Sequence, residues 1–371
     1  MEQKFFERAL ELAKKGQGFT SPNPCVGAVI VKNGKILGEG YHKKAGGKHA
    51  EIVAFESARK RGFSVQGSDI YVTLEPCCHI GKTPPCTDAL IQFGVKRVFI
   101  GMKDPFHLVH GKGLQVLKKS GIDTFVLSQK NPLFKQIVLI NQPFLKSVKT
   151  GLPYVTLKCA VSLDGKVATS VGDSQWITGE KTRTDSRIER SKCDAVLVGA
   201  GTIKADNPQL GVHKSFFKKF ITRVIIDPNL SISIKSNVFR DQHVVVVTTE
   251  LANKKNIEIF RKQGIHVEIF GKNRVNIKNL LKFLYNQGIH HVFVEGGGKI
   301  HGSFFDAAGA EKNVVDRVIW YVAPKIIGGI ESIDSVAGKG VQIIAKSHVL
   351  QMPQMEILGN DIKVSGYLNL Y

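Results

Sequence analysis

Residues 49–86 hold the stretch that decides the fold of the first half, in three motifs: His49-Ala50-Glu51, Glu75-Pro76-Cys77 and Pro84-Pro85-Cys86. One imidazole and two thiols, from His49, Cys77 and Cys86, can supply three tetrahedral ligands to Zn²⁺ and leave a fourth position for water. Zinc held in this way lowers the pKa of its water to roughly 7. Glu51 is not needed as a ligand, so it can move a proton from the water to a leaving nitrogen. This combination is typical of zinc-dependent deaminases of nucleobase-like rings.

His49 and Glu51 can serve one site only where a helix begins, because residues two apart in a regular helix do not share a face. Residues 43–48 favour a loop, and the apolar positions within 52–58 favour a helix directly behind it. A structural zinc site is the alternative interpretation, since such sites usually have four protein ligands. The fourth ligand could then come from either of two neighbours, Cys78 or His79.

The second cysteine comes late, because eight residues separate Cys77 from Cys86. Deaminases of nucleic acids and of cytidine commonly close their site with Pro-Cys-x-x-Cys instead. Within the longer insertion, Lys82 and Thr83 are candidate contacts for the anionic group of a small substrate. The alternative for Lys82 is a solvated connector.

Length and composition indicate a globular protein of two domains. The chain has 371 residues, 43% of them hydrophobic, which is enough for two cores. No apolar run approaches the roughly 20 residues of a membrane span, and the N-terminus lacks the features of a signal peptide. Cys25, Cys159 and Cys193 lie singly, as is usual in a reducing compartment. We therefore expect a cytoplasmic protein with no membrane partner.

The formal net charge of +21 raises the question of nucleic-acid binding. The lysines are spread along both halves, however, and no nucleic-acid-binding motif is interleaved with them. We expect no nucleic-acid partner, because a basic chain equally attracts small phosphorylated substrates and dinucleotides.

The first half alternates between strand and helix patterns, which predicts an α/β sheet with helices on both faces. Asn33-Gly34 between two β-prone stretches is a strong hairpin signal, and the last predicted strand covers residues 124–127. Residues 147–153 favour a linker. The predicted domains are residues 1–146 and 150–371.

The second half has the pattern of another α/β unit. Its predicted helices and strands are helices at 180–190 and 276–285, with strands at 154–161, 195–198, 223–227, 243–249, 266–270, 291–294 and 317–322.

Two stretches of the second half can bind a ligand. A predicted strand runs into Gly296-Gly297-Gly298-Lys299 and then a helix, and bare amides at a helix start suit a phosphate. A tight turn is the alternative there, and the dinucleotide-binding fingerprint Gly-x-Gly-x-x-Gly is missing. Residues 200–208 are predicted as a loop, in which Thr202 and Asp206 either serve a ligand or cap a turn.

These motifs together resemble those of the bifunctional deaminase–reductases of riboflavin biosynthesis, the RibD family. The matching stretches are residues 22–27, 38–42, 49–51, 73–86, 162–165, 174–179, 202–208 and 294–297. The resemblance implies an N-terminal cytidine-deaminase-like three-layer α/β/α domain and a C-terminal dihydrofolate-reductase-like α/β domain. It also implies a homo-oligomer, a dimer or larger.

The resemblance further implies two reactions on one small phosphorylated pyrimidine. The first is zinc-dependent hydrolytic deamination of 2,5-diamino-6-(5-phosphoribosylamino)pyrimidin-4-one, with Glu51 as the catalytic residue. The second is reduction of the ribosyl group to a ribityl chain by NADPH. The residues implied as NADPH contacts are Ala160, Trp176, Thr202, Asp206, Gly296, Gly297, Gly298 and Lys299. Those implied as substrate contacts are Asn23, Ser174, Arg190, Leu210, His213 and Glu295.

The sequence departs from the family pattern after Leu210, where Thr-x-Arg is usual and Gly211-Val212-His213 stands here. His213 would then have to replace an arginine that binds phosphate, and a deaminase with a silent reductase half is the main alternative function. Two further alternatives are a nucleic-acid editing deaminase and a non-catalytic chain with structural zinc. For Arg190 and Trp176 the alternatives are an exposed helix cation and a packed core residue.

Overall fold

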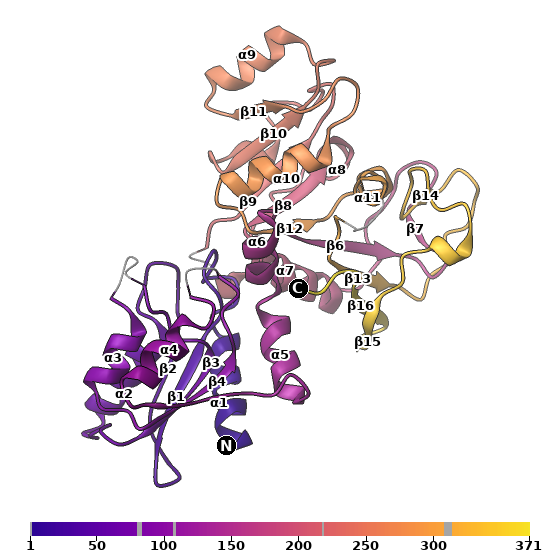
Figure 1. Cartoon of the computed structure of the whole chain (residues 1–371). Coiled ribbons are helices and arrows are strands. Elements are labelled where there is room, and N and C mark those ends of the chain that lie inside the picture. The colour runs from indigo at the N-terminus through magenta and orange to yellow at the C-terminus, as the bar shows by residue number, and fades with distance from the viewer. Residues whose placement is uncertain (1, 80–83, 107–108, 217–218, 308–313) are drawn as a thin grey trace. The chain divides into compact units, whose positions relative to one another are not determined.

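The computed structural model describes residues 2–79, 84–106, 109–216, 219–307 and 314–371, so Lys82 and Thr83 lie outside the described residues. The chain divides into two compact units, one of Met1–Gly151 with Tyr371 and one of Leu152–Leu370 (Figure 1). Among the helices that the structure describes, none combines the length and apolarity of a membrane crossing.

The first unit is built on a five-stranded sheet with the order β2-β1-β3-β4-β5. Its strands are β1 (Gly27–Lys32), β2 (Lys35–Tyr41), β3 (Asp69–Leu74), β4 (Arg97–Met102) and β5 (Asp123–Val126). Strand β1 is antiparallel to β2 and β3, whereas β3, β4 and β5 run parallel. The predicted hairpin is confirmed, with Asn33 and Gly34 both at positive φ in the turn.

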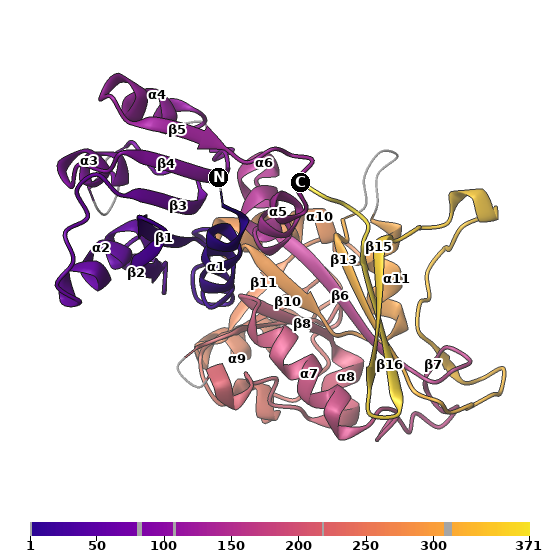
Figure 2. The ribbon, with the colours of Figure 1, turned by 90° about the horizontal axis from the view of Figure 1, so that it is seen from below.

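Helices cover both faces of this sheet, as the view in Figure 2 shows. They are α1 (Gln3–Lys14), α2 (Ala50–Lys60), α3 (Cys86–Gln92), α4 (Lys112–Lys119), α5 (Pro132–Ile140) and α6 (Gln142–Thr150). One core joins α2, α3 and α4 to the sheet through Ala54, Leu90 and Leu117, and another joins α1 and α5 through Phe6 and Ile137. The predicted three-layer α/β/α architecture is thereby confirmed.

The predicted linker at residues 147–153 is wrong in its first part, because α6 continues to Thr150. Gly151 ends this helix in the left-handed conformation, at φ +64. Gly151 and Pro153 are therefore the stop signals of a helix. Helices α5 and α6 were not predicted.

The second unit contains a nine-stranded sheet with the order β11-β10-β9-β8-β12-β6-β13-β16-β15. The strands of this unit are β6 (Tyr154–Val161), β7 (Lys166–Ala168), β8 (Ala195–Gly199), β9 (Thr222–Ile226), β10 (Val244–Thr248), β11 (His266–Ile269), β12 (His291–Val294), β13 (Arg317–Val322), β14 (Ile333–Asp334), β15 (Gln351–Leu358) and β16 (Asp361–Tyr367). Following this order across the sheet, every neighbouring pair of strands from β11 to β13 is parallel. Strands β16 and β15 then add an antiparallel edge.

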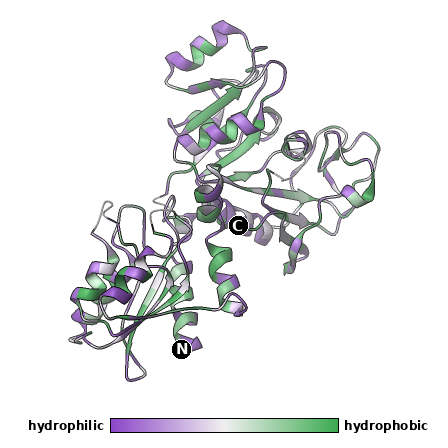
Figure 3. Ribbon diagram, in the orientation of Figure 1, coloured by the Kyte–Doolittle hydropathy of each residue, from purple (hydrophilic) through white to green (hydrophobic). Residues whose placement is uncertain are grey.

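Helices on both faces complete the second unit. They are α7 (Glu180–Ser191), α8 (Ala200–Asp206), α9 (Lys254–Lys262), α10 (Ile277–Asn286) and α11 (Gly298–Asp306). Apolar residues line the strands and the inner faces of the helices, as Figure 3 shows, with α10 and α11 in one core and α8 and α9 in another. The predicted α/β class is confirmed, but the loop predicted at residues 200–208 is wrong, because α8 occupies most of it.

Candidate active sites

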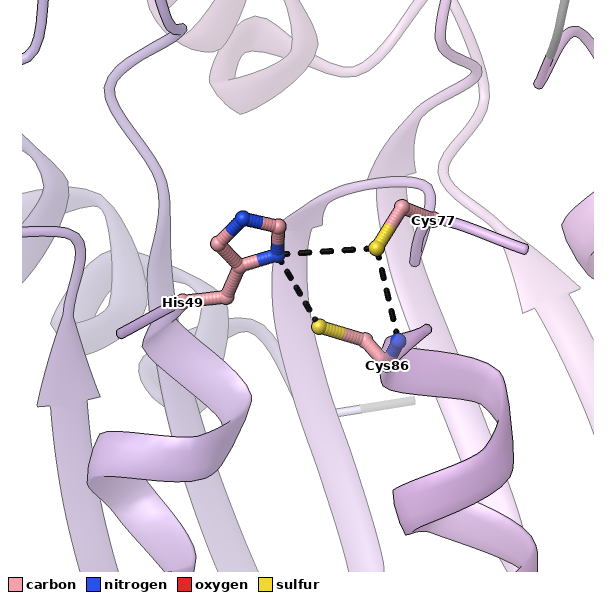
Figure 4. Close-up of side chains that lie close together, drawn as sticks. All are labelled: His49, Cys77 and Cys86. Atoms are coloured by element: carbon pink, nitrogen blue, oxygen red, sulfur yellow. Dashed lines mark hydrogen bonds between the residues drawn. The ribbon is translucent and has the colours of Figure 1, made fainter. Parts of the chain in front are cut away.

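Three side chains from separate elements meet in the first unit. His49 lies immediately before α2, Cys77 follows β3, and Cys86 begins α3. His49 Nδ1 is 3.2 Å from Cys86 Sγ and 3.5 Å from Cys77 Sγ (Figure 4). All three ligand atoms lie within 4.8 Å of one another.

These distances fit one zinc ion. Tetrahedral zinc with Zn–S bonds of about 2.3 Å and a Zn–N bond of about 2.0 Å places nitrogen and sulfur about 3.5 Å apart. Among the described residues the group has three members, His49, Cys77 and Cys86, and it includes neither Cys78 nor His79. Three protein ligands are typical of catalytic zinc, whereas structural zinc takes four.

The start of α2 explains how His49 and Glu51 serve one site. His49 is the N-cap, with an extended backbone at φ −70 and ψ 161, and the helix begins at Ala50. The helix lies directly on β2, because Cβ atoms at Gly38 and Gly40 would come within 2.4 Å of its backbone. The glycines of the 38–42 motif therefore let α2 approach the sheet closely.

Glu51 is 3% exposed, and its carboxyl interacts with all three candidate ligands, His49, Cys77 and Cys86. Burial raises its pKa, and the negative charge of Cys77 raises it further. A carboxyl with a raised pKa is better suited to accept a proton from one neighbouring group and pass it to another.

The two thiols differ in their affinity for a proton. Contact with the Cys86 thiol lowers the pKa of Cys77, and the hydrogen bond with His49 lowers it further. The backbone N–H of Cys86 also donates to Cys77 Sγ at 3.3 Å. The contact with Cys77, followed by burial, raises the pKa of Cys86. Of the two thiols, Cys77 is therefore the one that loses its proton more readily.

Asn23, the predicted substrate contact, lies beside this group. Its side-chain amide is 3.0 Å from His42 Nε2, and the His42 and His49 rings meet edge to face with their centroids 5.5 Å apart. His42 belongs to the 38–42 motif, but the sequence alone gave it no role.

Glu75 anchors the loop that carries Cys77, a role that was not predicted from the sequence. Its buried carboxylate accepts three backbone N–H groups, from Asp104 at 3.2 Å, Gly111 at 3.0 Å and Leu114 at 3.3 Å. Gly111 and Leu114 belong to the N-terminal end of α4. Glu75 thus fixes the chain two residues before Cys77.

A second group of predicted residues lies in the second unit. Strands β8, β12 and β6 are parallel neighbours, so their carboxyl ends meet at one edge of the sheet. Ala160, Thr202 and Glu295 lie at or just beyond these ends. Open α/β sheets bind ligands at this edge.

Arg190 pairs with Glu295 across two elements. The distance from Arg190 Nη1 to Glu295 Oε2 is 3.1 Å, and Ser186 Oγ donates to Glu295 Oε1 at 3.2 Å. Arg190 is only 9% exposed, and its buried Nε has no hydrogen-bond partner among the residues that the structure describes. The structure therefore contradicts the interpretation of Arg190 as an exposed helix cation.

Trp176 is 61% exposed, so it is not a core residue. The Arg183 guanidinium lies 4.4 Å from the centre of its ring, and Lys325 Nζ donates to its carbonyl oxygen at 2.8 Å. The neighbouring Gln175 donates to Asp206 Oδ1 at 2.9 Å. Two predicted NADPH contacts, Trp176 and Asp206, are thus linked through residues that were not predicted.

The glycines after β12 have different neighbours. A Cβ at Gly296 would meet Ile300 Cβ at 2.3 Å, and one at Gly298 would meet the Asp334 carbonyl oxygen at 2.2 Å. A Cβ at Gly297, the N-cap of α11, would meet no atom of the described residues within 4 Å. Internal packing explains Gly296 and Gly298, while Gly297 borders open space suited to a ligand.

Comparisons with known proteins address both units. The model of the cytidine and deoxycytidylate deaminase zinc-binding region matches residues 1–102, and that of the RibD C-terminal domain matches residues 153–364. Riboflavin biosynthesis protein RibD of Bacillus amyloliquefaciens is 41% identical, over 99% of this chain and 96% of its own.

The chain belongs to the RibD family. The solved structure of Acinetobacter baumannii RibD is 34% identical, covers 98% of both chains and has a TM-score of 0.85. That of a Thermotoga maritima diaminohydroxyphosphoribosylaminopyrimidine deaminase/5-amino-6-(5-phosphoribosylamino)uracil reductase is 36% identical, covers 98% of this chain and 97% of its own, and has a TM-score of 0.84.

Family membership makes the chain a bifunctional enzyme of riboflavin biosynthesis, with a zinc-dependent deaminase domain and an NADPH-dependent reductase domain. The folds are those expected, cytidine-deaminase-like and dihydrofolate-reductase-like.

Of the other predicted reductase contacts, Leu210 and His213 follow α8, Ser174 precedes α7, and Lys299 belongs to α11. Leu210 is buried at a positive φ of 53, and the His213 backbone N–H donates to Ser191 Oγ at 2.8 Å, at the end of α7. His213 Nδ1 lies 2.8 Å from Ser215 Oγ. Ser174 is half-buried and Lys299 is exposed.

Proposed function

We propose that this RibD chain deaminates 2,5-diamino-6-(5-phosphoribosylamino)pyrimidin-4-one and then reduces the product's ribosyl group. One observation carries the proposal. The ligand set His49, Cys77 and Cys86, with buried Glu51 beside it, shares one chain with a RibD reductase domain.

In the first step a ring carbon loses its exocyclic amine and gains oxygen from water. His49, Cys77 and Cys86 would hold zinc, which when bound lowers the pKa of a water at its fourth position. Glu51 takes a proton from the water and delivers it to the departing nitrogen, which leaves as ammonia. The raised pKa of Glu51 suits this transfer, because the carboxyl must hold the proton between the two events.

Asn23 holds the pyrimidine ring in this proposal, because its amide lies next to His42 at the same end of the unit as His49. Lys82 and Thr83 remain candidates for contact with the substrate phosphate.

In the second step the open imine form of the ribose would gain hydride at C1′, which bound NADPH would supply, and a proton at its nitrogen. Trp176, Thr202, Asp206, Ala160 and the 296–299 turn are the proposed cofactor contacts. Arg190 is the proposed partner of the substrate phosphate, because its planar guanidinium can bind two oxygens and its buried Nε is unpaired within the described part of the chain. Ser174, Leu210, His213 and Glu295 complete the proposed substrate site.

A coupled assay tests the two steps together. The purified full chain receives the diamino pyrimidine phosphate and NADPH, with ammonia release and NADPH absorbance followed in parallel. We expect both signals, with NADPH oxidation following ammonia release. Ammonia release without NADPH oxidation would support the deaminase with a silent reductase half, an alternative motivated by His213 in place of arginine. Absence of both would refute the proposal.

We propose a homo-oligomer that pairs through the second unit. Strand β15 forms one edge of the nine-stranded sheet, and its Met355 and Ile357 are 79% and 78% exposed. Exposed apolar edges invite strand pairing, and pairing of two copies about a twofold axis would cover both edges at once.

We also propose residues 1–146 and 150–371 as the catalytic domains and the cytoplasm as their location. The compact units agree with such a division to within a few residues, and the six cysteines form no disulfide in the structure.

A further inference from the structure

His42 connects two parts of the deaminase site. Its Nε2 lies 3.0 Å from the Asn23 amide nitrogen, and its Nδ1 lies 3.0 Å from the carbonyl oxygen of Lys48. The Lys48 carbonyl belongs to the peptide bond that leads into His49. His42 itself is only 3% exposed, and both contacts are partly buried.

The chemistry of these contacts determines which ring nitrogen of His42 carries the proton. A carbonyl oxygen can only accept a hydrogen bond, so Nδ1 must donate to Lys48. The Asn23 amide and the Lys48 carbonyl carry no charge, and a buried imidazole whose hydrogen-bond partners are uncharged stays neutral. In a neutral imidazole with its proton on Nδ1, Nε2 is an acceptor.

The orientation of Asn23 follows from this tautomer. An acceptor at Nε2 requires the NH₂ group of the Asn23 amide to face His42, whichever way the amide is drawn. The Asn23 carbonyl oxygen is then left to accept a hydrogen bond from another group. That oxygen suits a substrate that presents an N–H at this position, such as a ring N–H or an amine.

We propose that His42 is a positioning residue that sets the substrate specificity of the deaminase site by fixing the Asn23 carbonyl oxygen as an acceptor. The inference rests on the proposed function, because it takes Asn23 as the contact for the pyrimidine ring. On this proposal the site selects rings that present an N–H to the Asn23 carbonyl oxygen. The Lys48 carbonyl, next to His49 in the chain, sets this selection because it fixes the tautomer of His42.

Two substitutions separate the contacts of His42. The amide of H42N can still donate to the Lys48 carbonyl but does not reach Asn23. The carbonyl oxygen of H42Q can accept from Asn23 in place of Nε2. We expect H42N to raise the KM for the pyrimidine about tenfold, the equivalent of one hydrogen bond of about 1.4 kcal/mol, with little change in kcat. We expect H42Q to stay within about threefold of the unsubstituted enzyme.

The matched control is H110N. His110 also contacts a backbone carbonyl through Nδ1, that of Asp104 at 3.2 Å, but it is exposed. We expect its KM to be unchanged. Zinc content and reductase activity of each preparation show whether the chain is folded. Equal losses in H42N and H42Q, or no loss in H42N, would overturn the proposal.

Nitrogen NMR of the unsubstituted protein gives a second readout, independent of turnover. With ¹⁵N-labelled histidine, and His42 assigned by its loss in H42N or H42Q, we expect a protonated Nδ1 and an unprotonated Nε2. A proton on Nε2 would overturn the inference even if the enzyme deaminates the pyrimidine. Failure of the unsubstituted enzyme to deaminate it would instead refute the proposed function, and this NMR result would remain interpretable.

Discussion

Glu75 shows how a residue that touches no substrate can govern a metal site. Its buried carboxylate has three backbone N–H donors from the segment 104–114, and the Cys77 backbone follows two residues later. A Cβ at Gly113 would lie 2.3 Å from the Pro76 carbonyl oxygen, so α4 presses directly on this loop. Groups that orient metal ligands typically contribute 10-fold to 100-fold in metal affinity.

We therefore predict that Glu75→Gln weakens zinc binding by about tenfold or more, measured by competition with a chromogenic chelator. The amide retains one acceptor oxygen but turns an NH₂ group towards backbone donors. The control is Asp227→Asn in the second unit, where a buried carboxylate likewise accepts N–H groups, from Ser231 and Ile232. Equal zinc affinity in both variants would contradict this role of Glu75.

His301 should make the second unit sensitive to acid. It is fully buried on α11, its Nδ1 lies 2.8 Å from the Ser335 carbonyl oxygen, and burial lowers its pKa to about 4. The unfolded chain binds this proton at the ordinary pKa of about 6.5. The contribution of neutral His301 to the free energy of unfolding is therefore fully present above pH 6.5. It falls by up to roughly 3 kcal/mol as the pH drops towards 4.

Urea unfolding at pH 7 and pH 4.5 measures this effect through the two tryptophans, Trp176 and Trp320, which both lie in the second unit. His301→Asn keeps a donor for the Ser335 carbonyl oxygen. In this variant the free energy of unfolding should differ less between pH 7 and pH 4.5, by about 2 to 3 kcal/mol, because the proton uptake by His301 is lost. His348→Asn, at an exposed position, is the control. An unchanged pH dependence in His301→Asn would contradict the assignment.

At the scale of elements, the turn between β12 and α11 allows packing and ligand binding to be separated. We predict that Gly297→Ala leaves the thermal midpoint unchanged, because φ is −81 and its Cβ meets no atom within 4 Å, but raises the KM for NADPH tenfold or more. Gly298→Ala should lower the midpoint, because its Cβ would overlap the Asp334 carbonyl oxygen. Normal NADPH binding by Gly297→Ala would show that no cofactor approaches this turn.

Periodicity predicted many elements but not all. Strands β6, β12 and β13 have their predicted bounds, since each is a run of β-prone residues between turns. Helix α8 was missed because Gly201 and Asn207-Pro208 favour a loop, although Asn207 in fact ends a helix at φ 40. Residues such as Gly201 and Asn207-Pro208 mark the end of a helix, but they do not show whether the helix lies before or after them.

The arrangement of the sites was predictable only where the residues are close in sequence or chemically distinctive. His49, Cys77 and Cys86 form a recognisable ligand set, and the structure brings them together. The contacts Arg190–Glu295 and Gln175–Asp206 join residues 105 and 31 positions apart. They depend on how strands and helices pack, which one sequence does not specify.

At the scale of the whole molecule, assembly is open to a direct test. We predict that the chain sediments as a dimer or larger at micromolar concentration, and that Met355→Glu with Ile357→Glu shifts it to the monomer. Both side chains are exposed, so the charges should not disturb the fold. A monomeric unsubstituted chain, or a variant of unchanged mass, would contradict pairing through β15.

One imidazole, two thiolates and one solvent position should surround a single zinc ion next to Glu51. Zinc-edge X-ray absorption of the purified full chain, combined with metal analysis, tests this arrangement most directly. We expect one zinc per chain with two sulfur ligands, one imidazole and one further oxygen. A chain without zinc, or zinc bound by three sulfurs or by four protein ligands, would contradict it.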